Sequence, residues 1–99
     1  MKFGLEDRHW KIIEDILLQP LKARGATVWI FGSRARGDQT KFSDLDVLYS
    51  STNKLSWADL ARTMEQIEES NLPIKVDIVA LEDLAESYHD RVLKERIRV

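Results

Sequence analysis

The sequence predicts a small α/β or α+β domain, in which a mixed β-sheet carries flanking helices. Short segments rich in β-branched and aromatic residues alternate with longer segments whose apolar residues recur at helical spacing. The expected order is helix, strand, strand, helix, strand, helix. A chain of 99 residues has room for a single domain, which we expect to span residues 1–99.

The chain begins with a predicted helix over residues 6–18. Its apolar residues are spaced to form one buried face, and acidic residues lie between them. Pro20 should end or kink this helix, because proline lacks the N–H that a helix interior requires. A second short helical segment over residues 21–24 is expected to stop at Gly25.

Two strands are expected next, with a polar loop between them. Residues 27–31 are β-branched and aromatic, which predicts the first strand. Residues 32–42 form the loop, and the second strand should run from Ser43 or Asp44 to Tyr49. A turn is expected over residues 50–54.

The second half of the chain predicts a helix, a third strand and further helix. Ser56 followed by Asp59 matches the capping pattern at the start of a helix, which we expect to continue through Ser70. A strand is expected over residues 74–80. Residues 81–86 and 87–97 are both expected to be helical.

Composition excludes several classes of protein. With 43% hydrophobic and 32% charged residues the chain is not of the disordered type. No cysteine is present, which excludes disulfides, zinc–thiolate sites and thiol nucleophiles. Apolar runs reach only four residues and no leader opens the chain, so we expect a cytoplasmic protein without membrane contact.

Charge is arranged in blocks along the chain. Residues 22–41 carry a net charge of +4, residues 42–90 carry −8, and residues 91–99 carry +3. An acidic protein without a long basic stripe is not expected to bind extended nucleic acid. The first basic block surrounds a Gly-Ser turn, which suits a compact anion such as a nucleotide phosphate.

Three carboxylates lie where strands normally carry apolar residues. Asp44 and Asp46 project from one face of the second strand, and Asp77 lies within the third strand. Oxygen ligands without His or Cys favour Mg²⁺ or Mn²⁺ over zinc. The alternative is that Asp44 caps a turn and that Asp46 pairs with Arg34 or Arg36.

The turn at Gly32 and Ser33 directly follows the first strand. Glycine lets the backbone approach a ligand, and the Ser33 hydroxyl with the following N–H groups can hold phosphate oxygens, especially if a short helix opens there. Arg34 and Arg36 could neutralise those oxygens.

The segment from Gly32 to Asp46 resembles the signature of the DNA polymerase beta nucleotidyltransferase superfamily, which is Gly-Ser, ten residues, then Asp-x-Asp. Its Ala-Arg-Gly and Ser-Asp-Leu-Asp pieces are similar to the minimal nucleotidyltransferase (MNT) branch. Asp77 falls where that family places its third carboxylate. The resemblance covers roughly residues 25–85 and implies the polymerase beta palm-like fold, a mixed sheet with flanking helices.

The resemblance also implies an activity and a site. Asp44, Asp46 and Asp77 would be catalytic and would hold two Mg²⁺ ions, or Mn²⁺. Gly32 and Ser33 would bind ATP, assisted by Arg34 or Arg36. The domain that holds the acceptor in kanamycin nucleotidyltransferase-like enzymes is missing, so a second chain is expected to complete the site.

The resemblance implies a protein partner. MNT proteins resemble the antitoxin half of a pair with a HEPN-family toxin, which implies transfer of AMP from ATP to a tyrosine of that toxin. A non-catalytic subunit that neutralises its partner by contact is the first alternative, and transfer to a small molecule is the second. The short chain also makes a homodimer or a hetero-oligomer plausible.

Overall fold

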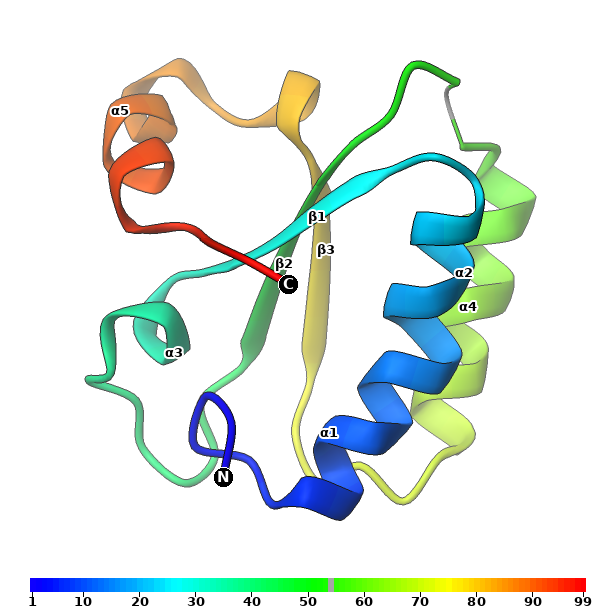
Figure 1. The fold of residues 1–99 in the computed structure, drawn as a ribbon, viewed down its shortest axis with the longest axis vertical. Helices are drawn as coiled ribbons and strands as arrows, with labels where there is room; N and C mark the ends of the chain where they lie inside the picture. The colour runs from blue at the N-terminus through cyan, green and yellow to red at the C-terminus, as the bar shows by residue number, and fades with distance from the viewer. Residues whose placement is uncertain (54) are drawn as a thin grey trace.

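The computed structural model describes residues 1–53 and 55–99 and contains a four-stranded mixed sheet with helices on both sides (Figure 1). The strand order is β3-β2-β1-β4, and β2 pairs parallel with β3 while both neighbours of β1 are antiparallel to it. The strands are β1 (Thr27–Phe31), β2 (Leu45–Ser50), β3 (Val76–Ala80) and β4 (Ile97–Arg98). The predicted fold class is confirmed.

The N-terminal helix is longer than its sequence predicted. It runs through α1 (Asp7–Ile13), the π-helical turn η1 (Glu14–Leu18) and α2 (Gln19–Ala23). The expectation that Pro20 ends the helix was wrong, because the chain continues helically through Pro20 in the first turn of α2. The π-helical turn shifts the hydrogen-bonding pattern just before it.

Helix α4 (Trp57–Glu69) connects the parallel strands β2 and β3. Its start was predicted correctly, since the Ser56 hydroxyl accepts a hydrogen bond of 3.1 Å from the N–H of Asp59. The turn expected over residues 50–54 includes Lys54, which lies outside the described residues.

The main core lies between one face of the sheet and the helices α1, α2 and α4, which Figure 1 shows together on one side. Alternate residues of the strands fill it, including Val28, Ile30, Leu45, Val47 and Val76. The opposite face is covered at its middle, where Leu48 is fully buried and the Arg96 guanidinium lies 4.2 Å from the centre of the Trp29 ring.

The C-terminal region differs from the prediction. The helical segment expected over residues 81–86 is a short turn, η2 (Leu81–Asp83), and α5 spans Glu86–Glu95. The helix predicted to reach Ile97 stops earlier, because residues 97–98 pair with the free edge of β1 and form β4. No helix in the described part of the chain is long and apolar enough to cross a membrane.

Candidate active site

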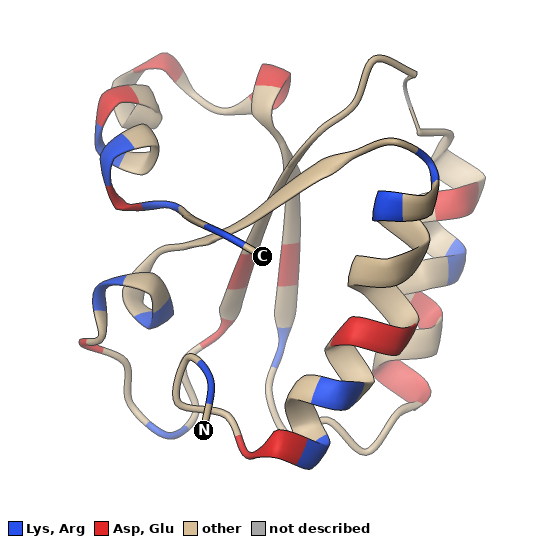
Figure 2. Ribbon diagram, viewed as in Figure 1, with Lys and Arg blue, Asp and Glu red and all other residues tan. Residues whose placement is uncertain are grey.

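Two of the predicted carboxylates lie side by side on neighbouring strands. Asp46 of β2 is paired in register with Asp77 of β3. Figure 2 shows acidic positions on both of these strands. Asp44 precedes β2 by one residue, at the same end of the sheet. Since Asp46 and Asp77 are offset by one position from the core residues of their strands, they face away from the main core.

The electrostatics of Asp46 show that negative charge is crowded here. Burial raises the pKa of Asp46 above its ordinary value of 3.8, and the charges of Asp77 and Asp44 raise it further. Arg36 opposes this rise and Glu95 adds to it. A half-buried carboxylate beside two others costs stability unless a cation compensates for it.

The alternative in which Asp46 pairs with an arginine is not what the structure shows. Within residues 1–53 and 55–99, Asp44 and Asp46 have no ion pair with Lys or Arg. Asp77 has one such partner, Lys75, whose Nζ lies 3.8 Å from its Oδ1 at an exposed position. Such a pair contributes little.

The donor set fits a hard divalent cation that arrives with a nucleotide. Mg²⁺ is usually held by one or two carboxylates together with phosphate oxygens and water. Among the described residues, no three His, Cys, Asp or Glu side chains stand close enough to enclose an ion by themselves. The carboxylates therefore supply part of a coordination shell, with room for oxygens from a ligand.

Gly32 joins the Gly-Ser turn to the carboxylates. Its φ of 76° and ψ of −158° belong to a region that is essentially restricted to glycine. A Cβ at this position would overlap Oδ2 of Asp46. The absence of a side chain at residue 32 thus allows the turn to lie directly against the Asp46 carboxylate.

Ser33 opens a short helix, α3 (Ser33–Arg36), immediately beyond Gly32. The first N–H groups of any helix have no partner within it. The loop predicted over residues 32–42 thus contains the helical turn whose presence favours phosphate binding.

The Arg34 side chain is not directed toward a phosphate site, although its position after the Gly-Ser turn predicted this. The side chain is buried, with 2% of the residue exposed, and donates from Nε, Nη1 and Nη2 to the carbonyl oxygens of Ser43, Phe3 and Lys41 at 3.0, 2.7 and 3.3 Å. It ties the N-terminus and the loop before β2 to α3. This geometry does not favour the predicted contact with phosphate.

Arg34→Met is expected to lower the free energy of unfolding by about 2 kcal/mol, because it leaves partly buried carbonyl groups without donors. For a domain of this size the Tm should fall by roughly 10 °C. Arg8→Met is the control, since Arg8 pairs with Glu6 on the surface. Thermal unfolding of both variants tests this, and equal Tm values would contradict it.

Arg36 is directed to the other side of α3. Its guanidinium contacts Glu95 of α5 at 2.7 Å and Asp38 at 3.1 Å. Arg36, Arg91, Lys94 and Glu95 line an open hollow of about 730 Å³. Arg91 and Lys94 are further candidate anion ligands that the motif does not include, and the net charge of +3 over residues 91–99 was their signal in the sequence.

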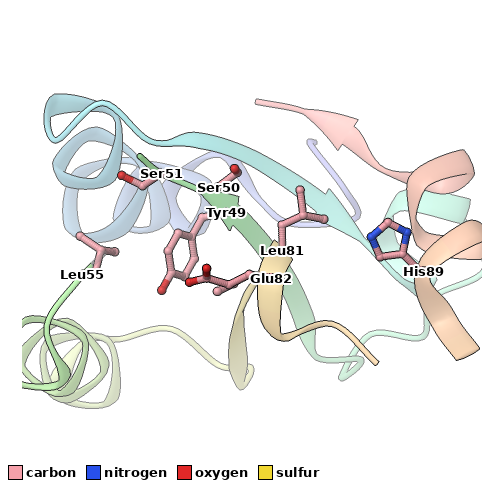
Figure 3. A pocket seen from close by; sticks show the side chains of 8 residues that line it. Tyr49, Ser50, Ser51, Leu55, Leu81, Glu82 and His89 are labelled. Carbon is pink, nitrogen blue, oxygen red and sulfur yellow. The ribbon is translucent and has the colours of Figure 1, made fainter. Parts of the chain in front are cut away.

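A second hollow, of about 230 Å³, lies at the carboxyl ends of β2 and β3. Residues of β2, η2 and α5 line it, among them Tyr49, Ser50, Ser51, Leu81, Glu82 and His89 (Figure 3). It lies toward the opposite end of the strands from Asp46 and Asp77. Burial, with Asp83 and Glu82 nearby, raises the pKa of Tyr49. The Glu82 carboxylate in its lining disfavours a phosphate group there.

A mixed sheet with paired carboxylates beside a Gly-Ser turn defines the class of protein. Residues 13–99 match the family described as "Polymerase beta, Nucleotidyltransferase". The chain belongs to this nucleotidyltransferase family, which confirms the class that the motif indicated.

Individual relatives agree with this assignment. The chain is 37% identical over 68 residues to MntA of Haemophilus influenzae, a probable protein adenylyltransferase; the match covers 69% of this chain and 60% of MntA. A solved structure described as a minimal nucleotidyltransferase is 31% identical, covers 100% of this chain and 97% of its own, and superposes with a TM-score of 0.71.

A more distant structure shares the fold. It is a toxin–antitoxin complex with AMP-PNP, 20% identical, with a TM-score of 0.66 over 86% of this chain and 70% of the other.

Proposed function

We propose that this chain transfers AMP from ATP to a hydroxyl group of a partner protein, with Mg²⁺ as the cofactor. The observation that carries the proposal is the position of Asp46, which lies beside Asp77 on the sheet and against Gly32 of the Gly-Ser turn. That arrangement supports a site in which metal-binding oxygens lie beside a bound triphosphate.

Relatives support both the reaction and the type of acceptor. MntA is described as a protein adenylyltransferase, which points to a protein rather than a small molecule as acceptor. Because the match covers less than two thirds of MntA, its activity is carried over here only as a proposal. The related complex with AMP-PNP supports an adenine nucleotide as the donor.

The mechanism assigns a role to each group. Asp44, Asp46 and Asp77 would hold Mg²⁺, which would offset the charge that builds up on the phosphate oxygens. Gly32 and Ser33 bind the β- and γ-phosphates, and Arg36 is the arginine better placed to assist. Asp77, with 42% of its side chain exposed, is open to the acceptor and helps to take the proton from its hydroxyl. The acceptor oxygen then bonds to the α-phosphorus of ATP, and pyrophosphate leaves as the bond between the α- and β-phosphates breaks.

The proposal also covers the identity of the partner protein. We infer that the partner is a HEPN-family toxin, that a tyrosine of that toxin is the acceptor, and that the chain acts as its antitoxin in the cytoplasm. The toxin–antitoxin complex among the structural neighbours supports a pair of this kind.

Incubation with α-labelled ATP, Mg²⁺ and the protein encoded beside this chain tests the proposal. We expect label on the partner with the wild-type chain and none after addition of EDTA. Tight association without any transfer of label would instead support the alternative, a subunit that neutralises its partner by contact.

A further inference from the structure

Helix α4 carries an apolar stripe that the rest of the structure covers only in part. Ile67 is its buried residue, whereas Leu60 and Met64 are half-buried. Trp57, in the first turn, is 88% exposed. A tryptophan so exposed beside other apolar side chains is typical of a contact surface.

The stripe borders a groove of about 420 Å³ between α4 and the edge strand β3. Trp57, Leu60 and Met64 line it from α4, and Val76, Asp77 and Ile78 line it from β3. We refer to these six residues with Asp83 as the α4–β3 groove. α4 packs chiefly against η1 rather than β3, which leaves this groove open.

The groove adjoins the candidate active site at the edge strand β3. Asp77 lines it and is also paired in register with Asp46. The Asp77 and Asp46 side chains face away from the main core, so a polypeptide bound along the groove would cross the edge strand β3 to bring its acceptor hydroxyl to the carboxylates. None of the other pockets described above is lined by any of the three site aspartates.

The charge of the groove indicates what it binds. Asp77 and Asp83 are its charged lining residues within the described part of the chain. An apolar groove with carboxylates suits a segment that has an apolar anchor and lysine or arginine neighbours. A second copy of this chain is disfavoured, because a two-fold contact centred on the groove would bring the same carboxylates toward each other.

We propose that the α4–β3 groove docks the acceptor segment of the protein substrate, and that this segment carries basic residues around its acceptor hydroxyl and an apolar anchor that packs on Trp57. The inference rests on the proposed function, since it names the surface that would bring the acceptor to Asp77.

Two sets of short synthetic peptides test the docking step in the absence of ATP. Each peptide contains one tyrosine and one leucine, flanked by Lys and Arg in one set and by Asp and Glu in the other. Fluorescence anisotropy should show that the wild-type chain binds the basic set roughly tenfold or more tightly than the acidic set.

Matched variants locate the binding surface. Trp57→Ser should weaken binding of the basic set by about tenfold, whereas Tyr88→Ser, which removes an exposed aromatic side chain from α5 outside the groove, should leave it unchanged. Asp83→Lys should reduce the preference for the basic set. Circular dichroism checks that each variant is folded.

Several results would overturn the inference. One is a wild-type chain that binds neither peptide set, or that binds both sets equally. Another is a Trp57→Ser variant that binds the basic set as tightly as the wild type does, or a wild-type dimer that Trp57→Ser dissociates. Transfer of label to the peptides at equal rates by wild type and Trp57→Ser would also overturn it, while supporting the proposed function. Conversely, binding in the expected pattern without transfer of label would contradict the proposed function and support the docking surface.

Discussion

Asp46→Asn is expected to abolish nucleotidyl transfer, with a loss on the order of 10³-fold, while the protein stays folded. Asparagine has nearly the same shape, so it fits against Gly32, but it removes the negative charge that lies against Gly32. The rate of transfer of labelled AMP measures the effect. Turnover at the wild-type rate with Mg²⁺ would show that Asp46 is not a metal ligand.

The same variant should be more stable than the wild type at neutral pH in the presence of a chelator. Because burial, Asp77 and Asp44 raise the pKa of Asp46 in the folded state, the folded protein binds this proton more readily than the unfolded chain. The ionised carboxylate therefore costs stability above its pKa. The difference in unfolding free energy should close as pH falls to the ordinary value of 3.8 and below. A wild type more stable than Asp46→Asn at neutral pH would contradict this.

Gly32→Ala is expected to impair both the fold and the activity. The backbone at residue 32 lies in a region that disfavours alanine by about 1–3 kcal/mol, and the added methyl group overlaps the Asp46 carboxylate. Because Asp46 or the turn must then move, transfer should fall by roughly 100-fold. Chemical denaturation and the transfer assay measure the two effects.

Gly25→Ala separates backbone strain from displacement of the carboxylate. Gly25 also has a positive φ, of 86°, but a Cβ there meets no atom within 4 Å. This variant should lose about 1 kcal/mol of stability and keep its activity. If Gly25→Ala lost as much activity as Gly32→Ala, the contact between Gly32 and Asp46 would not explain the loss.

The prediction of the site carboxylates rested partly on local alternation along a strand and partly on the family resemblance. Alternation along a strand places Asp44 and Asp46 together, and the family signature places Asp77 on the neighbouring strand. The start of α4 was predictable from the local sequence, since it depends on a hydrogen bond between the hydroxyl of Ser56 and the N–H of Asp59.

Other features depend on contacts between distant segments and were not predictable from local pattern. The β4 strand exists because residues 97–98 meet the edge of β1, which overrides their helical pattern. The position of Arg34 after Gly-Ser predicted a phosphate ligand. Its side chain instead donates a hydrogen bond to the carbonyl oxygen of Phe3, which lies 31 residues earlier in the chain. The exposure of Trp57 likewise depends on how α4 sits against η1.

Binding of Mn²⁺ in the presence of AMP-PNP, followed by electron paramagnetic resonance, tests the central claim most directly. The wild-type chain should bind Mn²⁺ tightly only when the nucleotide is present, because the aspartates alone do not enclose an ion. Asp46→Asn should bind it at least about tenfold more weakly. Equal Mn²⁺ affinity in the wild type and Asp46→Asn would contradict a metal-dependent transferase site at these carboxylates.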